Sequence, residues 1–189
     1  MEFLAALAGA LVGGFFSILA TKAAHKDQLE LQRQATQENA KAILYALSHE
    51  IRCVWTMYMA EMGKYVEEHP NENGYKIVFP VNANYFAVYD ASAASLGLIS
   101  EPKMRNQVII TYTLAKALID TYTMNNQMVK GLGEAIGNQL ILNNAATARV
   151  VQSNEQALGV YANQIRLFHG NCKQAMTALD ALFVQQGIF

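Results

Sequence analysis

The chain is poor in the residues that interrupt helices or build covalent frameworks. Its 189 residues include only three prolines, and all of them lie between Pro70 and Pro102. Because proline is the strongest helix breaker, the long regions on either side are free to form helices, and the sequence predicts an all-α fold. The two cysteines, Cys53 and Cys172, are too few for a disulfide framework, so we expect reduced thiols.

Net charge and catalytic motifs are also scarce. The formal charge of −1 leaves no basic excess to neutralise phosphates, so we expect no nucleic-acid partner. The sequence has no phosphate-binding glycine loop, no dinucleotide-binding glycine fingerprint, no zinc-protease helix motif and no nucleophile elbow. The Glu-x-x-His pairs that build di-iron sites in helical bundles are absent too. These absences favour a non-enzymatic protein without a catalytic residue or a cofactor.

What the chain does contain is a long uncharged run at its start, Phe3–Thr21. As a helix this run covers roughly 28 Å, close to the hydrocarbon thickness of about 30 Å, and we expect residues 1–22 to be a transmembrane anchor. A secretory signal peptide is the alternative, but it needs a basic start, whereas Met1 is followed by Glu2. The basic residues that come after the run predict an amino terminus outside and a cytoplasmic body: Lys22, Lys26 and Arg33.

Small residues form two neighbouring ridges along this segment. Gly9 and Gly13 make a GxxxG pattern that Ala5 extends by one turn, and Gly14 belongs to the second ridge. In lipid, small residues let helix backbones approach closely. We therefore predict membrane-helix packing through these four residues, although glycine and alanine are also common in membrane helices in general.

After the anchor, the sequence predicts a juxtamembrane helical stalk and then a cytoplasmic bundle. Residues 23–43 are mostly polar and continue the anchor without Gly or Pro, whereas residues 44–189 predict a three- or four-helix antiparallel bundle. Apolar residues recur there at spacings of three and four, which is typical of a helix facing a core or a coiled-coil seam. In the outgoing helix they are Leu44, Leu47, Ile51, Val54 or Trp55, Tyr58, Met62 and Tyr65, and in the last helix Leu158, Tyr161, Ile165, Phe168, Cys172, Met176, Leu179 and Phe183.

The end of the outgoing helix and the segment after it carry weaker signals. The helix is expected to stop by Pro70, and the next thirty residues form the one irregular region. A β-prone run, Tyr75–Phe79, lies in it, and because long structureless loops are unusual we expect a short helix near Asn84–Leu96.

The two later helices have clearer ends. Ser100 and Pro102 predict a capped helix start, and this helix runs to about Asn143 with a kink or break at Gly131–Gly137. The last helix is expected from about Ala146 to about Gln185.

Charge is distributed unevenly along the chain. From Lys22 to Lys76 fifteen residues are charged, whereas from Asn106 to Ile165 only six are. Depletion of charge marks the core of an interface, so we predict that Asn125–Val151 meets another copy or a partner protein. A neutral solvated surface is the alternative. The candidate interface residues are Asn125, Gln139, Leu140, Ile141 and Asn144.

Two His–Cys pairs could carry chemistry. His49 and Cys53 are four residues apart, and His169 and Cys172 are three apart, so each pair shares a helix face. If the two helices were adjacent, these side chains could form a tetrahedral zinc site. Core packing is the competing explanation, since buried structural cysteines are common.

The segment from Phe79 to Ile99 combines Phe79-Pro80, Tyr85-Phe86, Val88-Tyr89-Asp90 and Leu96-Gly97-Leu98-Ile99. It resembles a pattern in uncharacterised bacterial single-pass inner-membrane proteins with a cytoplasmic helical domain. The resemblance covers about twenty residues and implies a location in the bacterial inner membrane, with no activity to carry over.

Three functions follow from these features. The first is a non-enzymatic, membrane-anchored helical protein that forms a homo-oligomer or docks a partner at the cytoplasmic face. The second is a membrane effector of a phage-defence or toxin system, with which the glycines of the anchor and of Gly131–Gly137 are compatible. The third is a metal-dependent or redox enzyme that uses the two His–Cys pairs.

Overall fold

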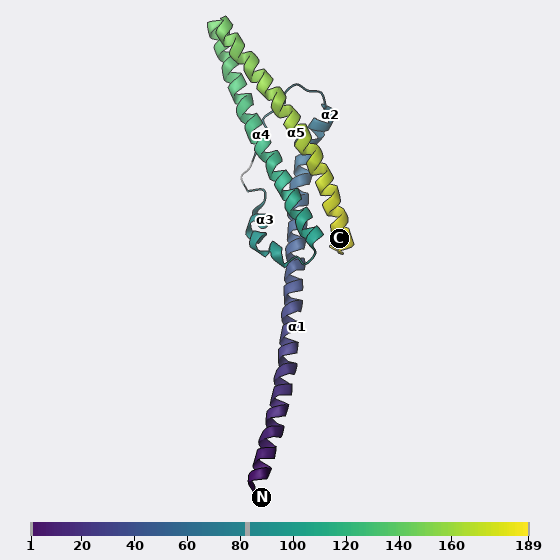
Figure 1. Cartoon of the computed structure of the whole chain (residues 1–189). Helices are drawn as coiled ribbons and strands as arrows, with labels where there is room; N and C mark the ends of the chain where they lie inside the picture. The colour runs from purple at the N-terminus through teal and green to yellow at the C-terminus, as the bar shows by residue number, and fades with distance from the viewer. Residues whose placement is uncertain (1, 82–83, 189) are drawn as a thin grey trace.

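The computed structural model describes residues 2–81 and 84–188, without the side chains of residues 2–16, 18–20 and 23. The described part contains helices and no strand, which confirms the predicted all-α class (Figure 1). In chain order its elements are α1 (Glu2–Tyr58), the π-helix η1 (Met59–Gly63), α2 (Lys64–Glu68), α3 (Ala87–Ser92), the 3-10 helix η2 (Ala93–Leu98), α4 (Pro102–Leu142) and α5 (Ala145–Gln185).

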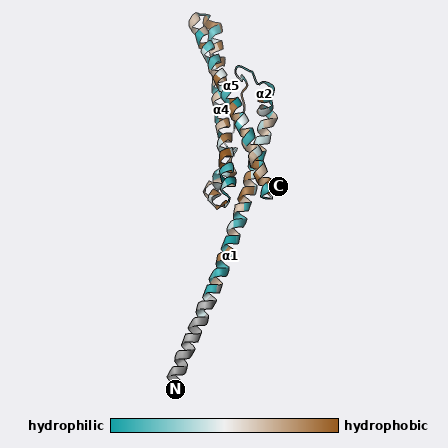
Figure 2. Ribbon diagram, turned by 45° about the vertical axis from the view of Figure 1, so that its right-hand side comes forward, coloured by the Kyte–Doolittle hydropathy of each residue, from teal (hydrophilic) through white to brown (hydrophobic). Residues whose placement is uncertain are grey.

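Helix α1 is one continuous rod of 57 residues. At 1.5 Å per residue it is about 85 Å long, and Figure 1 shows its first half projecting away from the other helices. Residues 24–39 are exposed at every position, and Ala40 is the first buried residue of the described side chains. In Figure 2 the coloured residues of this projecting part are mainly hydrophilic.

Most residues of the predicted membrane anchor have side chains that are not described. Ala5, Gly9, Gly13 and Gly14, the predicted packing residues, therefore lie outside the described side chains. Among the residues that the structure does describe, no helix has the length and apolar character needed to cross a membrane.

The body is a helical bundle built from the second half of α1 and the antiparallel pair α4 and α5 (Figure 1). The predicted spacing of apolar residues explains this packing, because most apolar residues that recur every three or four positions along these helices are buried. One core cluster lies where α1 enters the bundle and includes Leu47, Ile51, Val108, Tyr112, Leu179 and Phe183. A second lies beyond it and includes Tyr58, Met62, Val66, Tyr75, Tyr122 and Ile165.

The π-helix changes which residues of the outgoing helix face the core. The sequence spacing predicts Tyr65 in the apolar stripe, but Tyr65 is only partly buried and Val66 is 3% exposed. A π-helix takes one more residue per turn than an α-helix, so the buried face is displaced by one residue after Met59–Gly63. The apolar pattern alone does not reveal this displacement.

The extended segment between α2 and α3 is held by side chains of α4. Tyr75–Phe79 is extended but pairs with no strand of the described chain, so the β-prone run does not form a β-strand. Instead Asn125 Nδ2 donates to the Tyr75 carbonyl at 2.9 Å. Asn126 accepts from the Phe79 N–H at 3.0 Å and donates to the Phe79 carbonyl at 2.7 Å. The short helix expected near Asn84–Leu96 is present as α3 and η2.

Helix α4 begins at Pro102, as predicted, but its cap differs. Glu101 is the N-cap residue and makes no side-chain capping bond, so the prediction of Ser100 as the cap is wrong. Of the kink or break predicted at Gly131–Gly137, the break is wrong, because α4 continues to Leu142. Its packing against α5 along the hairpin offsets the low helix propensity of these glycines.

The hairpin turn between α4 and α5 follows from two asparagines. Asn143 has φ 40° and ends α4 in the left-handed conformation that asparagine tolerates. Asn144 caps α5 by accepting from the N–H groups of Ala146 and Thr147, and Thr147 returns the bond in a capping box. The predicted start and end of the last helix are therefore confirmed to within one residue.

Candidate functional site

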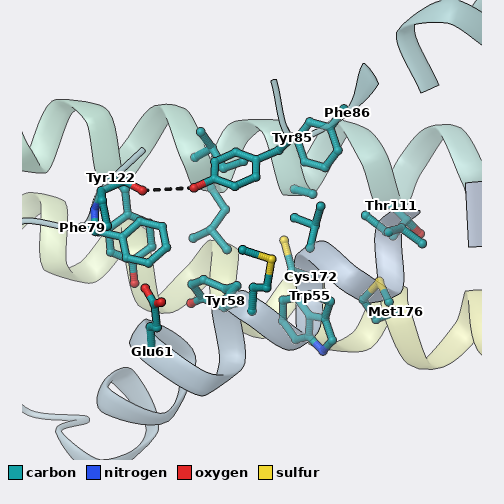
Figure 3. A pocket seen from close by; sticks show the side chains of 17 residues that line it. Trp55, Tyr58, Glu61, Phe79, Tyr85, Phe86, Thr111, Tyr122, Cys172 and Met176 are labelled. Carbon is teal, nitrogen blue, oxygen red and sulfur yellow. Dashed lines mark hydrogen bonds between the residues drawn. The ribbon is translucent and has the colours of Figure 1, made fainter. Parts of the chain in front are cut away.

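The bundle contains a partly open cavity of ≈ 280 Å³ where α1, the π-helix, the extended segment, α4 and α5 meet. Figure 3 shows the side chains that line it. Most of its wall is apolar, and six aromatic residues contribute to it: Trp55, Tyr58, Phe79, Tyr85, Phe86 and Tyr122. A small apolar cavity with a few polar groups is the usual form of a small-molecule site.

The aromatic rings pack against one another at one end of the cavity. The Tyr58 ring centroid is 5.2 Å from Trp55 and 6.0 Å from Tyr122, and Phe79 lies 5.2 Å from Tyr122. The interplanar angles are between 37° and 59°, so the rings are tilted rather than stacked face to face. Tilted pairs at these distances are favourable because the electron-poor edge of one ring meets the electron-rich face of another.

Polar groups in the wall are few and mostly uncharged. Burial raises the pKa of the Cys172 thiol to about 12, so the thiol stays protonated. The hydroxyl of Tyr122 is buried and has no hydrogen-bond partner in the described part of the chain. Burial also raises the pKa of Tyr122 above its ordinary value, and the phenol remains neutral.

Glu61 is the one charged residue among those that line the cavity. It belongs to the π-helix, and its exposed side chain stands at the edge of the cavity. In Figure 3 its carboxylate points toward Phe79 and Tyr122 rather than away from the bundle. Among the described ion pairs none involves Glu61.

A hydrogen-bonded chain runs from the cavity wall to the surface. The Tyr58 hydroxyl lies 2.8 Å from Nδ1 of His169, and Nε2 of His169 lies 3.3 Å from Glu67 Oε1. Lys173 donates to the same carboxylate oxygen at 2.6 Å. The arrangement is consistent with a neutral imidazole that accepts at Nδ1 and donates at Nε2.

The surroundings of Tyr58, His169 and Glu67 shift the pKa of each group in this hydrogen-bonded series. Burial lowers the pKa of His169 below its ordinary value, and the neighbouring Glu67 opposes this only in part. Lys173 and His169 together lower the pKa of the Glu67 carboxyl. Burial raises the pKa of Tyr58, so its hydroxyl stays protonated near neutral pH.

The candidate interface residues have different surroundings. Leu140 and Ile141 are 79% and 80% exposed at the hairpin tip, and Asn144 is exposed while it caps α5. Gln139 is partly buried and accepts a hydrogen bond from Thr147. Asn125 has no exposed surface in this structure and binds the Tyr75 carbonyl of the extended segment.

The two His–Cys pairs do not come together. His49 and Cys53 are exposed on α1, whereas His169 and Cys172 are buried on α5. Within the described residues, no group of three or more His, Cys, Asp or Glu side chains is placed to hold a metal ion. The zinc site that the spacing suggests is therefore not assembled by the described residues.

Sequence reasoning misses the cavity and the role of His169, because both depend on segments far apart in the chain. The only signal for the cavity is the aromatic content of the region around Phe79–Phe86. The chain matches no protein-family model, no curated protein and no solved structure.

Proposed function

We propose that this protein is a membrane-anchored helical assembly protein that associates with further copies of itself at the cytoplasmic face of the bacterial inner membrane. The observation that carries the proposal is the tip of the α4–α5 hairpin. Its last α4 turn exposes three consecutive large aliphatic side chains, Leu140, Ile141 and Leu142, at 79%, 80% and 60%. Clustered exposed apolar side chains mark sites of protein interaction.

The hairpin tip has the properties of a self-complementary surface. Between Asn106 and Ile165 the chain has six charged residues, three of each sign, so two copies of the tip would not repel each other. A heterologous partner would more often be selected by complementary charge, which this surface lacks. A second copy of the chain is therefore the occupant that fits it.

The shape of the molecule supports the same proposal. The start of α1 and the hairpin tip lie at opposite ends of the molecule (Figure 1). An anchor at residues 1–22 would hold the body at the membrane surface and leave the tip free. The small residues Ala5, Gly9 and Gly13 would add a second contact between copies within the bilayer.

The test is the mass of the detergent-solubilised full-length protein, determined by native mass spectrometry. We expect a defined homo-oligomer for the native chain and a smaller species for Leu140→Lys/Ile141→Lys, because a buried unpaired charge opposes association. Leu167→Lys is the matched control, since Leu167 is also an exposed leucine (61%) but lies on the body of α5. It should leave the mass unchanged.

Two results would contradict the proposal. One is an unchanged oligomer in the Leu140→Lys/Ile141→Lys variant with native helicity by circular dichroism. The other is a monomeric native chain that co-purifies with a different protein in fixed proportion, which would make the chain a subunit of a mixed complex.

A further inference from the structure

The cavity combines features that suit one class of ligand. Its walls are aromatic, its volume of ≈ 280 Å³ admits a small organic molecule, and its one charged lining residue is an acid. We propose that this cavity binds a small hydrophobic monocation, such as an aryl-alkyl ammonium ion, with Glu61 as its counter-ion. This ligand site is independent of the proposed self-assembly.

The aromatic walls favour a cation over a neutral ligand. The faces of Trp, Tyr and Phe rings carry negative electrostatic potential and attract ammonium groups within about 6 Å of the ring centroid. The chain already uses the same chemistry beside the cavity, where Lys116 Nζ lies 5.8 Å from the centroid of Phe86 and 5.1 Å from that of Tyr89. That lysine is paired with Asp90 and does not neutralise Glu61.

The charge balance of the cavity points the same way. The phenols of Tyr58 and Tyr122 and the thiol of Cys172 stay neutral, because burial raises the pKa of each. Glu61 is then the one acidic residue of the lining, and it has no described cationic partner. An anionic ligand would be repelled, whereas a monocation would complete an ion pair at the cavity edge.

The backbone explains why an acid stands at this edge. Glu61 is the third residue of the π-helix Met59–Gly63, and such wide turns inside helices frequently occur at functional sites. The residues on either side of it along the stripe, Tyr58 and Met62, are buried in the core. In Figure 3 the carboxylate projects from this turn toward the rings of Phe79 and Tyr122.

The chain provides its own reporter for the test. Trp55 is the only tryptophan of the sequence, and it lines the cavity. The full-length protein, held in neutral detergent, would be titrated with benzyltrimethylammonium while tryptophan fluorescence is recorded. Two compounds of matched shape separate charge from size: neopentylbenzene, the neutral isostere, and phenylmethanesulfonate, an anion. We expect the cation to bind saturably. Neopentylbenzene and phenylmethanesulfonate should bind at least about tenfold more weakly or not at all.

Three variants assign the response to this cavity. Glu61→Gln keeps the shape and removes the charge, so we expect about tenfold weaker binding of the cation. Glu68→Gln is the matched control, because Glu68 is an exposed acid of the following helix α2 that is not among the lining residues. Ala115→Leu places a larger side chain in the wall of the cavity and should abolish binding while circular dichroism stays native.

The proposal is overturned by any of three results. Equal binding of the cation and neopentylbenzene would remove the role of charge. Unchanged affinity of Glu61→Gln for the cation would show that Glu61 is not its counter-ion. A fluorescence response that does not saturate at millimolar concentrations, or that survives in Ala115→Leu, would show that the cavity is not the site.

Discussion

At the scale of single residues, His169 couples the fold to pH. Because its pKa is lowered in the folded chain, the unfolded chain binds more protons between that lowered value and the ordinary histidine value of about 6.5. Stability therefore rises with pH through this window and falls as the solution is acidified below about 6.5. The lowered pKa of Glu67 acts in the same direction, at the lower pH where carboxyls titrate.

We expect the native chain to unfold at a lower urea concentration at pH 5 than at pH 7.5, and the difference to shrink in His169→Gln. Urea titrations followed by circular dichroism at the two pH values measure it. His25→Gln, which changes an exposed histidine of the projecting part of α1, should retain the native pH dependence. Equal pH dependence in the native chain and His169→Gln would show that His169 does not titrate in this window.

Both the backbone conformation at position 74 and the side chain next to it favour glycine there. Its φ of +131° is unfavourable for residues with a side chain, and an added Cβ would lie 3.0 Å from the Cβ of Leu158 on α5. Gly74→Ala should therefore lower the free energy of unfolding by about 1–3 kcal/mol, as measured by urea unfolding. Gly131→Ala should instead raise it by up to about 1 kcal/mol, because nothing lies within 4 Å of its added Cβ. Similar effects in the two variants would contradict this assignment.

At the scale of elements, the extended segment depends on α4 for its backbone hydrogen bonds. The amide of Asn126 satisfies both the N–H and the carbonyl of Phe79. Each such bond contributes about 1 kcal/mol net, so Asn126→Ala should raise the hydrogen-exchange rate of the Phe79 amide by at least about tenfold. Exchange measured by mass spectrometry on peptides that cover 69–86 tests this. Asn106→Ala, at an exposed position of α4, should leave the rate unchanged.

Sequence patterns predict the long helices well because their signals are local. The ends of α5 follow from Asn144, which caps it, and its buried face follows from the spacing of Leu158, Ile165 and Leu179. The displacement from Tyr65 to Val66 cannot be predicted in the same way. It comes from the π-helix Met59–Gly63, and no residue type marks such a turn.

The candidate site is less predictable than the helices. Asn125 is predicted from the sequence as an interface residue, yet Asn125 and Asn126 bind the backbone of a segment about 50 positions earlier. The four residues of the suggested zinc site share helix faces in pairs, but the two pairs differ in burial. Spacing along one helix defines a face and does not define which neighbour that face meets.

At the scale of the whole molecule, the described core clusters begin at Leu44 and end at Ile188. A chain that lacks residues 1–23 should therefore keep its helical bundle and its thermal midpoint within a few degrees, while it leaves the membrane fraction. Circular dichroism melting and carbonate extraction of membranes measure the two properties. A shortened chain that remains in the membrane fraction would contradict the anchor, and one that unfolds would contradict an independent core.

The π-helix also has a mechanical consequence. It joins α1 to α2 without a break, so the backbone from Glu2 to Glu68 is one rod with a single wide turn near its end. If that turn tightened to α geometry, one residue would be released. Helix α2 would then rotate relative to α1 by about 100° and move along the helix axis by about 1.5 Å. The wide turn therefore fixes the angular position of α2 relative to α1, and its loss would rotate the end of the helical rod.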